Sequence, residues 1–190
     1  VTVTGTGGGS AGSQNYGIQV SGSGSQITAS GGHVNATGQG GGTGAASNSN
    51  YGILLDSEGQ IAPSPNGNAT VQGSGGTSVG TNNFGVLITG TNTRITASGH
   101  ISVTGVEGGG TNGLGILLLE GNGITTIGNN KNIALIANSM QILGNVSTAM
   151  GGSITLRPYT NGAGIDLGAS SDPVGGPLGL SDEELDHINT

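Results

Sequence analysis

The sequence lacks cysteine and has few charged or aromatic residues among its 190 positions. Without cysteine, neither a disulfide framework nor a thiolate metal site can form. Charged residues make up 7% of the chain and aromatic residues 2%, whereas a globular domain usually carries about 25% charged residues. This composition argues against an ordinary globular enzyme and is typical of a repetitive protein that is stabilised by stacked repeats.

Among the charged residues, the positively charged ones are the fewer. Arg94, Lys131 and Arg157 are the only lysine and arginine residues, and the net charge is −7. Because binding to a phosphate backbone depends on such residues, we expect no nucleic-acid partner. No apolar run approaches the roughly 20 residues that span a bilayer, so we expect no membrane insertion. The chain starts and stops within repeat-like sequence and has no signal peptide, and we interpret it as an excerpt of a much longer repetitive protein.

Glycine, by contrast, occupies 43 positions, while apolar residues make up 32% of the chain. The apolar residues fall in short β-branched clusters with glycine between them, which indicates turns between strands and not a flexible linker. Glycine does not recur at every third position, which excludes a collagen triple helix.

Three short motifs recur four times in the same order. The first is an alternating strand that closes on a glycine, at residues 1–5, 34–38, 69–73 and 101–105. The second is an aromatic residue or leucine, a glycine and then β-forming residues, at 16–20, 51–55, 84–88 and 114–118. The third is a short strand around an isoleucine, at 26–29, 60–62, 94–97 and 123–126.

Three strands per repeat predict an all-β fold, a right-handed parallel β-helix with three sides. Each repeat would form one coil and stack on the next at about 4.8 Å. We expect a single segment over residues 1–190 with about six coils. Residues 1–130 would form four long coils with glycine-rich loops, and residues 131–190 two shorter coils that end in a short helical turn.

The repeats also separate interior from exterior positions. Successive residues of a strand face opposite sides of its sheet, so the aliphatic positions should form columns along the interior. The expected core ladder comprises Val3, Ile18, Val20, Ile27, Ile53, Leu55, Ile61, Val71, Val86, Ile88, Ile95, Val103, Ile116, Leu118 and Ile124. The outward positions of the first motif hold hydroxyl and amide side chains instead.

One outward column does not fit a soluble surface. On the second motif it holds Leu54, Leu87 and Leu117, and stacked exposed leucines are unusual in a soluble protein. Two interpretations remain open. Either the long glycine loops fold back over these leucines, or the leucines form a lateral contact with another rod or a partner protein.

The repeat changes after residue 127. The spacing from Ile133 to Ile154 is 21 residues, which fits a coil without the long loop. A sixth coil would place residues 154–156, 165–167 and 178–180 on its three sides.

A single helical turn is expected next. Ser181 and Glu184 fit a capping box, which predicts a helix of one or two turns. A helix this short would need to pack Leu185 and Ile188 onto the rod.

The C-terminal third carries a family resemblance. The sequence reads IALIAN at 133–138, ILG at 142–144 and GGSITLRP at 151–158. These stretches resemble the haemagglutination-type repeats of large bacterial exoproteins, the filamentous-haemagglutinin class. The stretches GIDLG at 164–168 and LGLSDEEL at 178–185 are similar to a segment of giant β-strand-repeat surface proteins. The resemblance implies a secreted, β-helical, adhesive protein at the bacterial cell surface, and it implies no particular receptor.

Parallel β-helices include polysaccharide lyases and hydrolases, whose catalytic sites cluster carboxylates. The candidate carboxylates are Asp56, Glu58, Glu107 and Glu120. Asp56 and Glu120 would lie two coils apart, about 10 Å at strand spacing, with no cation beside them. We therefore expect no enzyme activity.

Metal and cofactor sites are not expected either. His33 and His100 occupy the same position in coils that are separated by the coil of Asn68, and metal ligands must lie about 2.0–2.1 Å from one point. Asp166 and Asp172 are calcium candidates without a supporting motif.

Together these patterns predict a structural and adhesive segment of a secreted bacterial surface protein, a stiff extracellular rod or filament for attachment. Expected partners are neighbouring repeats of the same chain, other copies through lateral or end-to-end contact, and cell-surface glycans or proteins. The alternative is a carbohydrate-binding or carbohydrate-cleaving module. An ice-binding β-solenoid is more remote, because Asn35, Gln72 and Ser102 interrupt the threonine columns.

Overall fold

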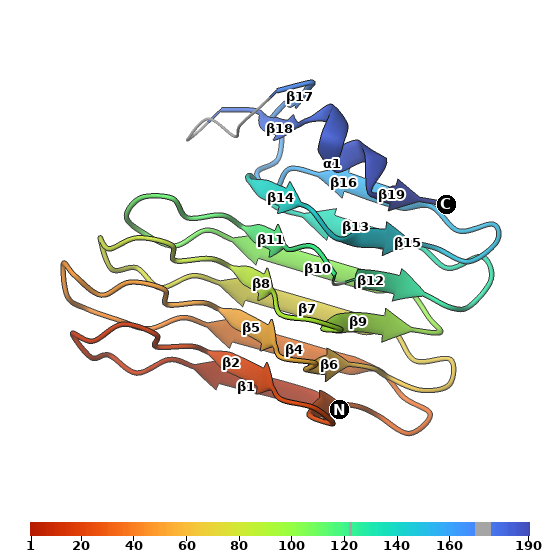
Figure 1. The fold of residues 1–190 in the computed structure, drawn as a ribbon, viewed down its shortest axis with the longest axis horizontal. Coiled ribbons are helices and arrows are strands. Elements are labelled where there is room, and N and C mark those ends of the chain that lie inside the picture. The colour runs from red at the N-terminus through yellow and green to blue at the C-terminus, as the bar shows by residue number, and fades with distance from the viewer. Residues whose placement is uncertain (122, 170–175) are drawn as a thin grey trace.

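The chain winds into a parallel β-solenoid in a computed structural model that describes residues 1–121, 123–169 and 176–190 (Figure 1). The first side is a sheet of β1 (Thr2–Thr6), β4 (Val34–Gln39), β7 (Ala69–Ser74), β10 (Ile101–Val106), β13 (Ile133–Ile136) and β16 (Ile154–Arg157). The second side joins β2 (Ile18–Ser21), β5 (Ile53–Asp56), β8 (Val86–Ile88), β11 (Ile116–Leu118) and β14 (Met140–Ile142). The third side joins β3 (Gln26–Ile27), β6 (Gln60–Ile61), β9 (Arg94–Ala97), β12 (Gly123–Thr126), β15 (Asn145–Ser147) and β19 (Ile188–Asn189).

Neighbouring coils pair in parallel and in the register that the repeats predict. The closing glycine of each first motif lies opposite its counterpart, so that Gly5, Gly38, Gly73 and Gly105 form one column. The members of the predicted core ladder lie in the interior, where each belongs to one core cluster or packs against it. Leu55, Ile88 and Leu118 are fully buried, whereas Val3 and Ile27 in the first coil are partly buried.

Two glycine columns explain how the first and second sides meet. A Cβ on Gly73 would overlap the carbonyl oxygen of Gly85 in the same coil, and Gly5, Gly38 and Gly105 face the second-motif glycines of their own coils in the same way. A side chain at these positions would hold the two sheets apart. The recurring glycines therefore fix the close approach of the sheets and do more than provide turns.

The regular solenoid contains about four full-length coils, built by β1 to β12, and not the six that were expected. A shorter fifth coil of β13, β14 and β15 follows, and Ile133 pairs with Ile154 as the 21-residue spacing predicts. The next turn is incomplete. Strands β16 and β19 extend the first and third sheets, but β14 is the last strand of the second sheet.

The assignment of residues 165–167 and 178–180 to two different sides of a sixth coil is wrong. Strands β17 (Ile165–Leu167) and β18 (Leu178–Leu180) pair with each other in parallel, with Ile165 opposite Leu178. The side chains of Leu178 and Leu180 are buried against the core, whereas those of Ile165 and Leu167 are 46% and 70% exposed. Only β18 therefore takes an interior position, and the third side of this turn is β19.

The predicted helical turn is confirmed as α1 (Asp182–Asp186), which begins with a capping box between Ser181 and Glu184. Leu185 and Ile188 pack against the core, as a helix this short requires. The carboxylate of Glu184 also accepts the backbone N–H of Ile142 in β14, at 3.1 Å. A side-chain oxygen thus replaces the carbonyl that a further strand of the second sheet would supply.

Candidate functional site

The leucine column of the second side is buried, although it lies on the outward face of its strands. Leu54, Leu87 and Leu117 are 4%, 7% and 8% exposed, and they form an outer apolar cluster with Phe84. The aromatic residues that end the glycine-rich loops pack against them, which agrees with the interpretation that the loops cover the column. A lateral contact through these leucines stays untested, but the exposure on which it rested is absent.

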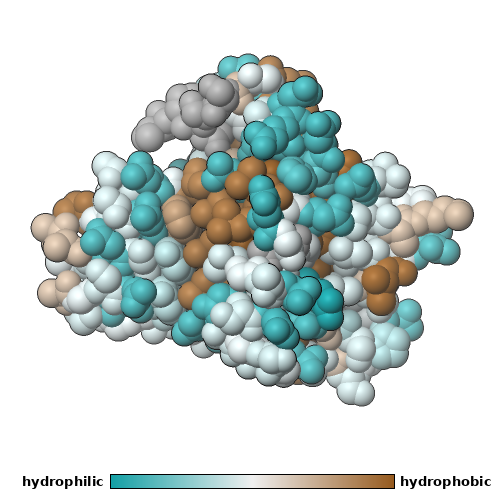
Figure 2. All heavy atoms as spheres, viewed as in Figure 1, coloured by the Kyte–Doolittle hydropathy of each residue, from teal (hydrophilic) through white to brown (hydrophobic). Residues whose placement is uncertain are grey.

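An aromatic stack runs beside the leucines. Tyr16 and Tyr51 stack with ring centroids 5.1 Å apart, and Tyr51 and Phe84 stack at 5.3 Å. Burial, and then the nearby Tyr51 and Asp56, raises the pKa of Tyr16 above its ordinary value. In the fourth coil, Leu114 occupies the motif position of the aromatic residue, so the aromatic stack ends at Phe84. Figure 2 shows an apolar area on this face, bordered by more polar side chains.

A ladder of buried asparagines inside the loops is not among the features predicted from the sequence. The side-chain oxygen of Asn50 accepts the backbone N–H of Asn15 at 3.0 Å, and that of Asn83 accepts the backbone N–H of Asn50 at 3.1 Å. Both Asn50 and Asn83 are fully buried, and Ser47 and Ser78 complete their hydrogen bonds. The signal was present in the sequence, since an asparagine precedes the aromatic residue in each of the first three repeats.

A second ladder explains the aligned histidines. His33 Nδ1 accepts the backbone N–H of Asn68, whose side-chain oxygen accepts that of His100. His100 Nδ1 in turn accepts the backbone N–H of Asn132, and Asn132 accepts that of Ser153. Each side chain bonds to the equivalent residue one coil further along the chain. The described residues contain no group of three or more His, Cys, Asp or Glu that could hold a metal ion.

The candidate carboxylates do not share one column. Leu55 pairs with Ile88, and Ile88 pairs with Leu118. The residues that follow them, Asp56, Thr89 and Leu119, therefore form the next column of the same side. Asp56 has no acidic neighbour in this column. Asp56 instead accepts a hydrogen bond from the Gln19 amide at 3.2 Å. The absence of catalysis stays a prediction, as do the carbohydrate and ice-binding alternatives. Asp172 lies outside the described residues, and Asp166 is in the exposed β17.

A cleft lies at the fifth coil, with a cavity volume of about 1020 Å³. The connection between the first and second sides shrinks there to residues 137–139, whereas the coils before it carry long loops. The fourth loop, residues 107–114, forms one wall, and Ser139, Met140 and Gln141 form the floor. Residues of the following turn, including Thr160 and Gly179, form the opposite wall.

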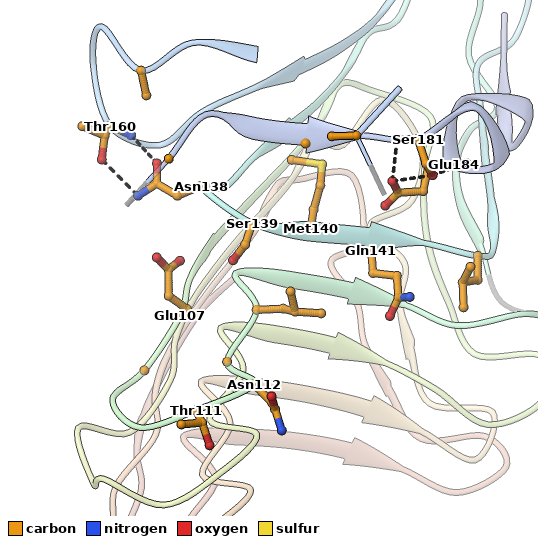
Figure 3. Close-up of a pocket in the computed structure, with 18 of the residues that line it drawn as sticks. Glu107, Thr111, Asn112, Asn138, Ser139, Met140, Gln141, Thr160, Ser181 and Glu184 are labelled. Carbon is orange, nitrogen blue, oxygen red and sulfur yellow. Dashed lines mark hydrogen bonds between the residues drawn. The ribbon is translucent and has the colours of Figure 1, made fainter. Parts of the chain in front are cut away.

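Glu107 is the acidic side chain of the loop wall. In Figure 3 it points away from its own loop, toward Asn138 and Ser139 across the cleft. One carboxylate oxygen, Oε2, is buried without a hydrogen-bond partner among the described residues. Asn138 and Thr160 are satisfied by bonding to each other, at 2.8 and 3.0 Å. The wall of the cleft therefore contains a buried carboxylate oxygen without a partner among the described residues, and its described lining contains no lysine, arginine or histidine.

Comparison with known proteins identifies no relative: no family model, curated protein or solved structure matches this chain. What the fold defines is a class, the β-solenoid repeat proteins. Within the described residues, no helix is both long and apolar enough to cross a membrane.

Proposed function

We propose that this chain is a structural and adhesive segment of a secreted bacterial surface protein, which forms part of a stiff extracellular rod. The observation that carries the proposal is the in-register stacking of the three sheets, in which each coil provides the backbone hydrogen-bond partners of the next. Repeats of this kind contact only their neighbours, so the architecture suits extension in one direction.

The side chains between coils support the same role. The interior aliphatic columns, the aromatic stack and the two polar ladders each join equivalent residues of successive coils. A pull along the stack would have to break several of these contacts at every step. The fold needs no disulfide for this, since the chain has no cysteine.

The outer face of the first side supports adhesion. Its outward columns carry threonine, asparagine, glutamine and serine, and Thr4, Thr37 and Gln72 are exposed and aligned. Such hydroxyl and amide groups donate and accept hydrogen bonds without strong desolvation of charge. We further propose an extracellular location at the bacterial cell surface, with self-association or binding to surface glycans or proteins.

The test is attachment under flow by a non-adherent bacterium that displays residues 1–190. We expect more attached cells than for the undecorated strain. Gly73→Ala should abolish the gain by disrupting the fold, and Gly32→Ala, where a Cβ meets nothing within 4 Å, should keep it. If Gly32→Ala and the unaltered chain are displayed and folded yet attach no better than bare cells, the adhesive role is wrong.

A further inference from the structure

We propose that the cleft at the fifth coil, lined by Glu107 and Asn112, docks one extended polypeptide segment that carries a lysine or arginine. This inference goes beyond the proposed function, because a rod can be stiff and adhesive without it. It rests on three features of the cleft: an unpaired backbone edge, a gap of one strand, and an unsatisfied carboxylate.

The first feature follows from the way the long loops stack. One loop position is left-handed in all four long coils, at Gln14, Ser49, Asn82 and Asn112, with φ between 55° and 64°. In the first three coils its backbone N–H donates to a carbonyl of the next loop. These bonds are Gln14 to Asn48, Ser49 to Thr81 and Asn82 to Thr111, at 2.9 to 3.0 Å.

The fourth loop has the same conformation but no loop to pair with. Within the described residues, the backbone N–H of Asn112 has no acceptor, because the fifth coil lacks this loop. The N–H of Glu107 is equivalent to that of Gly75, which donates to Val106, and it too has no acceptor among the described residues. The carbonyl of Gly113 corresponds to that of Asn83, which accepts from Gly108, and no described residue donates to it. The edge thus offers two donors and one acceptor to an incoming strand.

The second feature is the size of the gap. Coils repeat at about 4.8 Å, so one missing loop between the fourth loop and the sixth turn leaves room for one extended chain. A complete coil of a second copy does not fit, because β13 and β14 already pair with β10 and β11 and fill the interior at this level. A single segment that adds to an open edge is a known mode of peptide recognition.

The third feature sets the charge of the segment. Glu107 occupies the column of Gly7, Gly40 and Gly75, where a Cβ would overlap an asparagine carbonyl oxygen of its own coil and, next, the backbone of the following loop. The Glu107 carboxylate is directed toward Asn138 and Ser139, and its Oε2 is buried with no hydrogen-bond partner among the described residues. A buried carboxylate oxygen is stabilised by a charged N–H donor, so a lysine or arginine of the docked segment completes the site.

The experiment measures binding of the whole 190-residue chain to a fluorescent glycine–serine peptide with one central lysine, by anisotropy. We expect saturable binding that weakens at least about tenfold in Glu107→Gln, the loss of a charge-assisted hydrogen bond. Glu120→Gln, an equal change of charge at an exposed position outside the cleft lining, should leave binding unchanged. Glu107→Lys should transfer the preference to a peptide with a central glutamate.

Two further measurements separate a docked strand from a simple charge site. Backbone N-methylation of the peptide should abolish binding, and amide hydrogen exchange at Asn112 should slow when the peptide is bound. The proposal is overturned if free lysine or the N-methylated peptide binds as well as the parent peptide. Binding of neutral oligosaccharides that depends on Glu107 and resists competition by the peptide would overturn it in favour of a glycan site. Failure of all peptides to bind would also overturn it, while leaving the attachment experiment to decide the adhesive role.

Discussion

In the first four coils nearly every stabilising contact is repeated, whereas the described residues of the C-terminal turn, 158–169 and 176–190, make contacts that do not recur. Gly73, Leu87 and Asn50 each meet counterparts in neighbouring coils. In the C-terminal turn, the capping box between Ser181 and Glu184 and the bond from Ile142 to Glu184 have no counterpart in the long coils. The comparison shows that repetition makes the long coils resistant to local errors of pairing, while the last turn depends on individual side chains.

The largest effect should come from the facing glycine columns of the regular coils. Gly73→Ala places a Cβ against the Gly85 carbonyl, and because both partners are backbone, the sheets must separate. We expect a loss of at least about 3 kcal/mol in the free energy of unfolding. Denaturant unfolding followed by circular dichroism measures it, with Gly32→Ala as the control. Equal stability of the two variants would show that the columns do not set the sheet approach.

The buried leucine column should give the next largest effect. Leu87→Ala removes a side chain that is 7% exposed, and we expect a loss of about 2.5 kcal/mol. Gln141, which pairs with Leu117 at the end of the same column, is exposed, so Gln141→Ala should change stability by less than about 0.5 kcal/mol. Urea unfolding measures both variants. A Leu87→Ala cost as small as the control would mean that the outer apolar cluster is open to water.

The C-terminal turn should respond locally. Glu184→Ala leaves the buried N–H of Ile142 without its acceptor, at a cost of about 2 kcal/mol. Amide hydrogen exchange should accelerate at Ile142 and in α1, while β1 to β12 stay protected. Glu183→Ala, at an exposed position of the same helix, is the matched control. Acceleration across all coils would contradict the distinction between the two regions.

The smallest effect concerns the histidine–asparagine ladder. His100→Leu removes the acceptor for the Asn132 N–H, and because this position is exposed we expect a loss of about 1 kcal/mol. His100→Asn keeps an acceptor, as Asn68 does naturally, and should lie within about 0.5 kcal/mol of the unaltered chain. Thermal unfolding at neutral pH compares the two. If His100→Asn lowers the stability as much as His100→Leu, the hydrogen bond from the Asn132 N–H to position 100 contributes nothing to stability.

The sequence allowed the three sides, the register and the interior columns to be predicted, because each motif recurs four times. Residues that occur once could not be placed this way. The stretches around Ile165 and Leu178 look like consecutive sides of a coil, yet they pair with each other because only Leu178 finds space in the core. The burial of Leu54 depends on the aromatic residues that precede the same strands, and pattern alone does not reveal that packing.

The cleft could be predicted from the sequence only in part. Glu107 breaks a column of three glycines, which an alignment of the repeats displays. The role of Glu107 in the cleft depends on the short connection between the first and second sides of the fifth coil. It also depends on residues of the following turn, which line the same cleft. Neither the volume of the cleft nor the unpaired Oε2 can be obtained from the order of residues.

The most direct test of the account measures how distance grows along the stack. Because the chain has no cysteine, spin labels can be placed at exposed positions of one column by Arg157→Cys combined with Thr4→Cys or Thr37→Cys. Thr4 lies five coils from Arg157 and Thr37 four, so the account predicts backbone separations of about 24 and 19 Å, a difference of one coil. Equal distances for the two pairs, or a difference unrelated to the coil number, would contradict the in-register stack.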